Sequence, residues 1–452
     1  MRDEEPSYAK WIIERVESVS KNRRFIFGRR LAEAGGRQGR RLPETEWWEE
    51  RPRSWAGNDS LTRDKSSILV LPMFTPTQTK LTKRLSTILA TTAVIGGIRF
   101  SSPLTQASPP QYTLTDLGTL GGIYSSALGI NASGQVVGQS FLADSTAYHA
   151  VRWDGTTATD LGAALGNYST ATGINASGQV VGSLNELGDR LHYHAVRWDG
   201  NTPTDLGTLG GDYSSAYAIN TAGQIVGFSE VAGAPIDHAV RWDGDTVTAL
   251  DVPGGGYSAA FGINDLGQIV GESEIGYAFG RHAVSWLGNT VIDLGTLGGD
   301  YSAAFGINAS GQIVGSAEVG GQHTFHAVRW DGTIATDLGA LSDAATDYSA
   351  AFAINASGQI VGYSSHANGD SSAFLYSEGV MYDLNTLLVN GSGVSVIDAR
   401  AINDLGQIAG WGSINGQIHG FRLDPLIVPE PTSVLLLLSG ISLLGLRRRR
   451  LE

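Results

Sequence analysis

The sequence predicts an all-β fold, a seven-bladed β-propeller that is closed because its N-terminal strand completes the last blade. A four-part phrase recurs seven times between Tyr112 and Asp424. Its parts are Asp-Leu-Gly, then Gly-Ile-Asn-x-x-Gly-Gln-Val-Val-Gly, then His-Ala-Val-Arg-Trp and Asp-Gly. Successive phrases are 44 to 48 residues apart, the length of a four-stranded propeller blade. The Asn of the phrase stands at Asn131, Asn175, Asn220, Asn264, Asn308, Asn355 and Asn403.

Each repeat contains four short segments that are typical of β-strands, as residues 127–161 illustrate. The first two segments, 127–131 and 135–138, flank a turn in which Gly134 supplies a left-handed residue. The third segment is 149–153, and Asp154-Gly155 is a strong hairpin signal before the fourth. We expect the Asn side chain of each turn to bond the backbone two residues on, which explains the Asn-Ala-Ser triplets better than glycosylation does.

The order of the segments predicts how the ring closes. The series begins with a lone strand of the fourth type, Tyr112–Leu117, and ends on a strand of the third type at Phe421. The first strand would therefore complete the last blade. A solenoid needs no such permutation and would require polar end caps. The innermost strands read Ala-Leu-Gly-Ile-Asn and similar, so we expect only small side chains at the centre.

Charge is unevenly distributed along the chain. The net charge is -13, and the repeat region holds most of the 44 acidic residues, no lysine and only eight arginines. Because such an acidic body repels phosphate backbones, we exclude nucleic acid as its partner. The chain has no cysteine, which excludes disulfides and thiolate metal sites. We expect no cofactor.

The N-terminal third of the chain contains a candidate export signal. Basic residues, among them Lys80 and Arg84, precede the apolar stretch 85–98, and Ala107 ends a Thr-Gln-Ala cleavage sequence. This pattern predicts a signal peptide over 73–107, with Met73 as its start. Residues 1–72 would then be an over-extended or disordered N-terminus. The alternatives are a buried helix at 85–98 and a genuine cytoplasmic extension before it.

The C-terminus has three parts in a fixed order: a Pro-Glu-Pro motif, an apolar stretch at 432–446 and four arginines. These parts are similar to the PEP-CTERM sorting signal. That resemblance implies export by a Gram-negative-type bacterium that makes exopolysaccharide, removal of the leader by signal peptidase, and processing by the membrane protease exosortase. The arginines would stay on the cytoplasmic side while the apolar helix stays in the membrane. The apolar stretch is short for a membrane span. The residues concerned are Pro429, Glu430, Pro431, Arg447, Arg448, Arg449 and Arg450.

The chain thus divides into the extension 1–72, the signal 73–107, the repeat domain 108–427 and the sorting segment 428–452. The repeat domain resembles the HAF repeat family through its His-Ala-Val phrases. That family implies an extracellular repeat protein and brings no known chemistry. The His-Ala-Val phrases begin at His149, His194, His238, His282 and His326.

For the sorting segment 428–452, a plain C-terminal anchor remains the alternative to a processed sorting signal.

The recurring polar residues favour architecture over chemistry. Equivalent histidines in separate blades cannot share one metal ion, so we expect no metal site and histidines that hydrogen-bond between adjacent blades. The Arg-Trp pairs are expected to pack between blades, with carboxylates such as Asp160 as partners. No blade offers a unique nucleophile, base and oxyanion donor, so we predict no catalytic residue.

We expect the ligand surface to be the loop face that contains the Tyr-Ser connections and the varied acidic loops. We expect a non-catalytic cell-surface or extracellular-matrix protein that binds glycan or protein there. The alternatives are a polysaccharide-acting lyase or hydrolase on the same ring, a purely structural matrix spacer, and acidic loops that are merely solvated. The candidate tyrosines are Tyr124, Tyr168, Tyr213, Tyr257, Tyr301 and Tyr348. The candidate acids are Glu186, Asp189, Glu230, Asp237, Glu272, Glu274 and Glu318.

Overall fold

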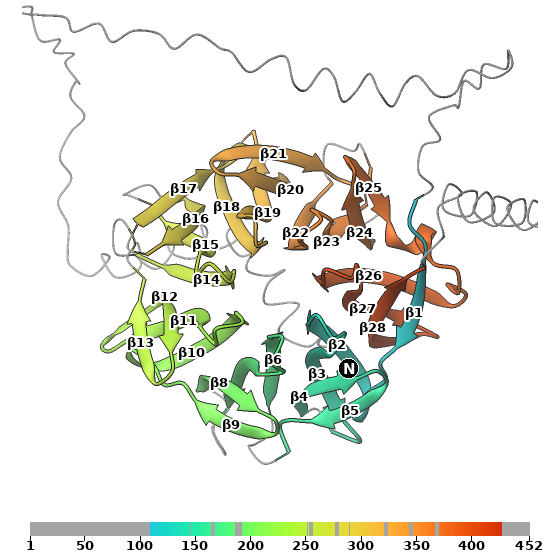
Figure 1. Ribbon diagram of the computed structural model, residues 1–452, viewed down its shortest axis with the longest axis horizontal. Helices are drawn as coiled ribbons and strands as arrows, with labels where there is room; N and C mark the ends of the chain where they lie inside the picture. The colour runs from blue at the N-terminus through green and yellow to red at the C-terminus, as the bar shows by residue number, and fades with distance from the viewer. Residues whose placement is uncertain are drawn as a thin grey trace, which may run out of the picture. The chain divides into compact units, whose positions relative to one another are not determined.

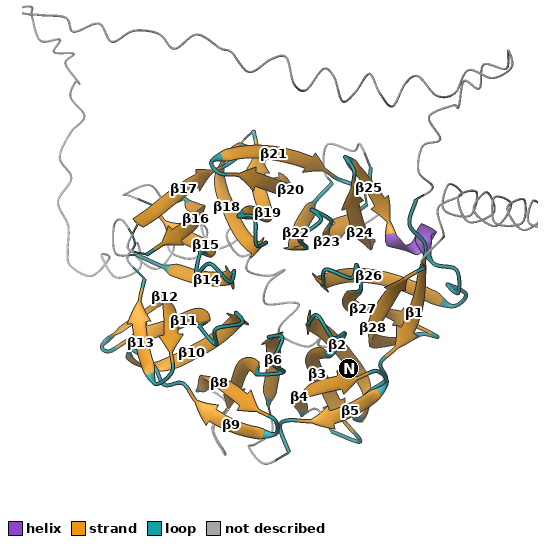
Figure 2. Cartoon of the chain, in the orientation of Figure 1, coloured by secondary structure: helices purple, strands orange, loops and turns teal. Residues whose placement is uncertain are grey.

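The computed structural model describes most of the repeat region and leaves both ends of the chain outside it. Within the described residues the chain is all-β, with a single 3₁₀ turn, η1 (Leu384–Leu387) (Figure 2). The predicted signal with Ala107 and the sorting segment from Pro429 to Arg450 lie outside the described residues. The described residues are 109–426 except 146, 164–167, 186–191, 251, 253–255, 276–279, 289, 321–323, 343–346 and 367–369.

Five sheets each contain four strands that follow one another along the chain in antiparallel order. The first two sheets are β6 (Ser169–Ile174), β7 (Val180–Asn185), β8 (Tyr193–Asp199) and β9 (Thr202–Asp205), then β10 (Gly210–Ile219), β11 (Ile225–Val231), β12 (Ala234–Asp243) and β13 (Thr246–Ala249). The third is β14 (Ser258–Ile263), β15 (Ile269–Glu274), β16 (Arg281–Leu287) and β17 (Thr290–Gly295). The last two are β18 (Gly298–Ile307), β19 (Gln312–Val319), β20 (Thr324–Asp331) and β21 (Ile334–Gly339), then β22 (Ser349–Ile354), β23 (Ile360–Ser365), β24 (Ser371–Ser377) and β25 (Val380–Asp383).

The two ends of the described chain meet in one eight-stranded sheet. A single parallel pair, Tyr124 with Ile418, joins its two halves. The first strand of the chain pairs with the last along its whole length, from Tyr112 opposite Pro425 to Asp116 opposite Phe421. The strands are β1 (Tyr112–Asp116), β2 (Gly121–Ile130), β3 (Val136–Leu142), β4 (Tyr148–Asp154), β5 (Thr157–Asp160), β26 (Val394–Ile402), β27 (Ile408–Ile414) and β28 (Gln417–Pro425).

The sheets lie side by side around a common centre (Figure 1). Strands β2, β6, β14, β22 and β26 lie nearest to that centre, and β5, β9, β13, β17, β21 and β1 lie outermost (Figure 1). In these sheets the strand that precedes the Asn turn thus lies inward, and the strand that follows the second hairpin lies outward.

The repeated Asn builds the turn between the first and second strands of each sheet. The Asn131 side-chain oxygen accepts hydrogen bonds from the backbone N–H groups of Ser133 and Gln135 at 3.1 and 3.0 Å. Gly134 has φ 79°, a left-handed conformation that costs glycine nothing. Both expectations for this turn are confirmed. The following hairpin also forms, with Gly155 and Thr156 between the paired residues Asp154 and Thr157.

The same Asn residues are joined in a closed cycle of hydrogen bonds between sheets. Each side-chain amide donates to the backbone carbonyl of the next Asn at 3.0 to 3.2 Å, and Asn403 donates to Asn131. Because the amide group also donates to a glutamine in its own turn, every Asn ties a turn to its neighbour.

The glycine that ends the second repeated segment allows close strand approach. A Cβ added to Gly138 would lie 1.9 Å from the carbonyl oxygen of Ser126 on the neighbouring strand. That pair of strands shifts register between Ala127 and Gly129, as at a β-bulge. Only glycine fits at this point.

The hydrophobic core lies between sheets. Trp198 packs with Val137 and Leu161 of the preceding sheet and with residues of its own sheet, and its indole N–H donates to the Leu161 carbonyl at 3.1 Å. The equivalent tryptophans are as deeply buried, at 0 to 1% exposure. The predicted packing of tryptophan between sheets is confirmed. The five residues are Trp153, Trp198, Trp242, Trp286 and Trp330.

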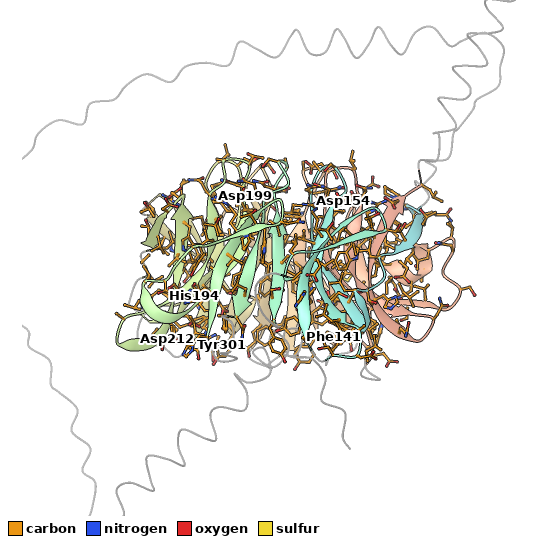
Figure 3. The ribbon with its side chains drawn as sticks, turned by 90° about the horizontal axis from the view of Figure 1, so that it is seen from below. Phe141, Asp154, His194, Asp199, Asp212 and Tyr301 are labelled. Atoms are coloured by element: carbon orange, nitrogen blue, oxygen red, sulfur yellow. The ribbon has the colours of Figure 1, made fainter. Side chains whose placement is uncertain are left out.

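The ring of sheets has two chemically different faces (Figure 3). Asp154 and Asp199 mark one of them, which we call the turn face because it contains the Asn turns and the Asp-Gly hairpins. Phe141, Asp212 and Tyr301 mark the opposite one, which we call the aromatic face (Figure 3). Pro425 follows Asp424, whose carboxylate accepts from Gln407 as Asp154 accepts from Gln135. The described chain therefore ends on the turn face.

Candidate functional site

The six candidate tyrosines occupy equivalent positions on the aromatic face, where the first strand of each sheet begins. Most of them are half-buried; Tyr257 is 9% exposed and Tyr348 is 37% exposed. Burial raises the pKa of the Tyr124 phenol, although hydrogen bonds to Ser126 and Gln139 act against this effect. These rings are thus held in place by their neighbours, and only part of each is presented to solvent.

Four rings on β2, β3, β4 and the start of the next sheet form what we call the outer aromatic run. Tyr124 lies 5.3 Å from Phe141, Phe141 lies 6.1 Å from Tyr148, and Tyr148 lies 5.1 Å from Tyr168, measured between ring centroids. Beside them Ile123 is 72% exposed. The run extends an apolar, partly exposed strip over two neighbouring sheets.

The acidic candidates are partly engaged by the backbone. The carboxylate of Glu318 accepts from Asp300 N at 2.8 Å, and Glu230 accepts from the equivalent Asp212 N at 3.3 Å. Glu274 accepts from Tyr257 N at 3.4 Å. In three consecutive sheets, one of these glutamates thus fixes the backbone near the start of the first strand. Glu272 pairs with Arg281 at 3.4 Å, and the Arg281 guanidinium lies 3.8 Å from the Tyr257 ring centre. Glu186 and Asp189 lie outside the described residues.

Glu230 is the centre of a local concentration of negative charge. Burial raises the pKa of its carboxyl, and the carboxylates of Asp237 and Asp212 raise it further. His192 lies 3.8 Å from Asp212. An arrangement of this kind suits cations or hydroxyl donors and disfavours anionic ligands.

The repeated histidines pair within their own sheets, so the expected hydrogen bonds between adjacent blades are a wrong prediction. His149 Nδ1 lies 2.9 Å from the Asp160 carboxylate, on the next strand of the same sheet. Strand pairing places the two side chains together, which the spacing of the repeat alone did not reveal. The same pairing joins His194 to Asp205, His282 to Asp293, His326 to Asp337 and His419 to Asp116.

The repeated arginines also have partners other than those expected. Arg152 Nε donates to Asp154 at 3.1 Å, two residues further along the strand, because Asp160 is engaged by histidine. Gln135 donates to the other oxygen of Asp154. Hydrogen bonds from Gln179 and Gln312 lower the pKa values of the equivalent Asp199 and Asp331. These groups hold the turn face together.

The centre of the ring carries large side chains, contrary to the expectation that only small ones fit there. Tyr217, Phe261, Phe305 and Phe352 come from four consecutive innermost strands, and adjacent ring centroids are 5.3 to 5.5 Å apart. We call them the inner aromatic arc. Their backbone is crowded, but the side chains project from it and stack on one another around the centre.

The inner aromatic arc ends at a buried ion pair. The Arg400 guanidinium lies 4.0 Å from the Phe352 ring centre and 2.6 Å from the Asp398 carboxylate, with side-chain exposures of 9% and 4%. Burial raises the pKa of Asp398, while Arg400 and a hydrogen bond from Trp411 act against that rise. Sequence reasoning missed this group. A comparison of the residue three positions before the repeated Asn would have found it, since arginine occurs there once among the seven repeats.

Several solved structures show a distant likeness to this chain. A gluconolactonase from Xanthomonas campestris is 10% identical, with TM-score 0.37, covering 71% of this chain and 96% of its own. TolB from Acinetobacter baumannii is 12% identical, with TM-score 0.35, covering 50% and 62%. A puromycin-hydrolyzing peptidase from Mycobacterium tuberculosis is 12% identical, with TM-score 0.43, covering 72% and 58%. At these scores the likeness carries no conclusion about fold or activity. No curated protein matches the chain.

The C-terminal segment matches a known family. Residues 428–450 match the PEP-CTERM protein-sorting motif, which confirms that part of the sequence prediction. The motif indicates an exported protein of a Gram-negative-type bacterium, held in the membrane before processing by exosortase and sorted to the cell surface. Among residues 109–426 no helix has the length and hydropathy to cross a membrane. The apolar stretch 432–446 lies outside the described residues.

Proposed function

We propose that this chain is an exported, non-catalytic surface or matrix protein that binds glycan through the aromatic face of a seven-bladed propeller. The sorting motif supports the location. The outer aromatic run supports the binding activity, and it is the observation on which the proposal depends. The His-Ala-Val phrases support a relationship to HAF repeat proteins as part of the same proposal.

The blade count rests on strand pairing and on the Asn cycle. Divided at the single parallel pair between Tyr124 and Ile418, the eight-stranded sheet becomes β2 to β5 and β26 to β28 with β1. Together with the five other sheets this gives seven groups of four. The seven-membered cycle from Asn131 to Asn403 and back supports the same count.

Ring chemistry favours glycan as the ligand. The face of an aromatic ring carries a negative quadrupole, which attracts the weakly positive C–H groups on the apolar face of a sugar. The outer aromatic run offers several such rings in one strip. Few side-chain torsions have to be frozen, because the rings are already held by neighbours. A flat chain of sugars is the ligand that such a strip fits best.

Charge narrows the class of glycan. The repeat region has no lysine, and the carboxylates of Asp212, Glu230 and Asp237 lie on the same face as the outer aromatic run. Anionic polysaccharides would be repelled by this field. Neutral polysaccharides, whose hydroxyl groups donate to carboxylates, are the class that we propose.

A glycan array followed by calorimetry on the purified exported protein tests the proposal. We expect binding to neutral oligosaccharides, and Phe141→Ala and Tyr148→Ala should each weaken it by about tenfold, as for a typical interface hot spot. Leu266→Ala is the matched control, because Leu266 is 72% exposed in an Asn turn on the opposite face. Its affinity should not change, and the melting temperature of each variant reports its folding.

Two results would overturn the proposal. Silence on the array would favour a structural spacer. Release of new reducing ends or unsaturated products from a bound polysaccharide would favour the alternative, a hydrolase or lyase.

A further inference from the structure

We propose that the Asp398–Arg400 pair, with the aromatic rings beside it, binds one neutral sugar unit at the centre of the ring, through contacts that differ from those of the outer aromatic run. The inference deepens the proposed function and rests on it for the class of ligand. Both charged groups act electrostatically on Tyr124, the first ring of the outer aromatic run, so the two sites adjoin at that ring and differ in their recognition chemistry.

The group is built where the last repeat departs from the others. The position of Asp398 is Ser or Thr in three repeats and Ala in the other three. The residue facing it across the sheet, Trp411, is equivalent to Gln139 in the first sheet. Arg400 stands where the other repeats have apolar, aromatic or threonine side chains. Those equivalents are Leu128, Thr172, Tyr217, Phe261, Phe305 and Phe352.

Two aromatic side chains contact the ion pair, and a third packs against one of them. Phe352 stacks with Tyr363 at 5.8 Å and 22° between ring planes, and it lies beneath the Arg400 guanidinium. The indole of Trp411 hydrogen-bonds Asp398. Phe352, Tyr363 and Trp411 are each half-buried, so each residue keeps some contact with solvent. A charged pair beside partly exposed rings is the composition expected of a polar-ligand site.

The pair leaves two polar atoms without a protein partner. Asp398 Oδ1, an acceptor, and Arg400 Nε, a donor, are buried and make no hydrogen bond among the described residues. Burying such groups is unfavourable, and a buried ion pair stabilises little compared with apolar residues of similar size. The local structure therefore retains an arrangement that folding alone does not favour.

The two atoms together select the chemistry of the ligand. In the proposed complex a hydroxyl group of the sugar donates to Asp398 Oδ1, and a hydroxyl oxygen accepts from Arg400 Nε–H. A carboxylate or phosphate would satisfy Arg400 but would be repelled by Asp398. An ammonium group would satisfy Asp398 but would be repelled by Arg400. A neutral polyol is thus favoured over both charged classes, and the surrounding rings favour a sugar.

Calorimetric titration of the exported protein with monosaccharides tests the inference, since one sugar unit is too small to span the outer aromatic run. The probes are glucose, galactose, mannose and xylose, with cellohexaose, mannohexaose and xylohexaose as longer ligands and glucuronate as the charged comparator. We expect one neutral monosaccharide to bind and glucuronate to bind at least about tenfold more weakly.

The decisive variant is Asp398→Leu with Arg400→Met, because apolar residues of similar size can replace a buried pair without loss of stability. It should keep the melting temperature and lose monosaccharide binding by at least about tenfold. Trp411→Phe should weaken binding, and Trp153→Phe is its control, a fully buried tryptophan between sheets. Phe141→Ala should leave monosaccharide binding unchanged.

The outcomes separate this inference from the proposed function. If hexasaccharides bind and depend on Phe141, but no monosaccharide binds, the pair is a hydrated structural feature only and the inference fails while the proposed function stands. If monosaccharide binding survives in the double variant, the inference also fails. If monosaccharides bind through Asp398 and Arg400 but Phe141→Ala changes no affinity, the outer aromatic run is not the site and only this inference stands.

Discussion

His419 Nδ1 lies 3.0 Å from the carboxylate of Asp116, although the two residues are 303 positions apart in the sequence. The same His–Asp contact occurs inside other sheets between residues only 11 apart, as in His149 and Asp160. The strand that begins the described chain thus takes the place of a fourth strand in the sheet that ends it. The first strand therefore joins the last sheet through the same His–Asp contact that the other sheets make internally.

A circular permutant should therefore fold like the natural chain. Leu426 N donates to the Gln111 carbonyl at 2.8 Å, so a short linker can join these ends, and a new start at Asp245 would make β13 the closing strand. We expect an unchanged circular dichroism spectrum and a melting temperature within about 2 °C, roughly 1 kcal/mol for a domain of this size. An unfolded permutant would show that β1 has a role that β13 cannot take.

Removing one member of the Asn cycle should destabilise the ring by similar amounts wherever the member lies. Asn403→Ala deletes the bond to Asn131 and the turn contacts of its own side chain, at a cost of about 1–3 kcal/mol. Asn264→Ala should cost the same in urea unfolding. Asn201→Ala, at an exposed turn residue, should stay within about 0.5 kcal/mol. A neutral Asn403→Ala beside a costly Asn264→Ala would contradict a closed cycle.

Alkaline pH should loosen the closing strand. Burial raises the pKa of the Tyr112 phenol on β1 from 10.0 to about 12, so the folded state holds this proton more tightly than the unfolded state. Its contribution is fully present below pH 10 and is lost as the pH rises towards 12, about 3 kcal/mol at most. Unfolding free energies at pH 9 and 11.5 measure the loss. Tyr112→Phe should reduce it, whereas Tyr348→Phe should leave it unchanged.

While the sorting segment is inserted in the membrane, the turn face should lie nearer to the bilayer than the aromatic face. Leu426 leaves the ring on the turn face, and the five residues 427–431 span at most about 18 Å. The chain has no cysteine, so Asn201→Cys and Ile123→Cys can each carry a single fluorophore. Lipid nitroxides should quench the label at position 201 more strongly in unprocessed protein. Equal quenching would contradict this orientation, and truncation after Leu426 should remove the difference.

Much of the repeat architecture was predictable because each structural feature recurs in several repeats. The Asn turn, Gly134 and the hairpin after Asp154 depend on local backbone chemistry that the sequence shows directly. The partner of His149 was not predictable in this way, since strand register decides whether Asp160 or a neighbouring sheet faces it. The Asp398–Arg400 pair was missed for another reason. The pair occurs once, in the last repeat. In the sequence alone Arg400 resembles ordinary variation between repeats, and only the structure shows its contact with Phe352.

The pairing of β1 with β28 also sets an order of events during export. β1 reaches the far side of the membrane first, but its partner strand arrives only after almost the whole repeat region has crossed. Until then its hydrogen-bonding edge has no native partner, and a contact between residues so far apart in sequence forms slowly. The ring can close only when translocation has delivered β28, a few residues before the segment that stops in the membrane. The last step of folding and the arrest of the chain therefore fall together in time.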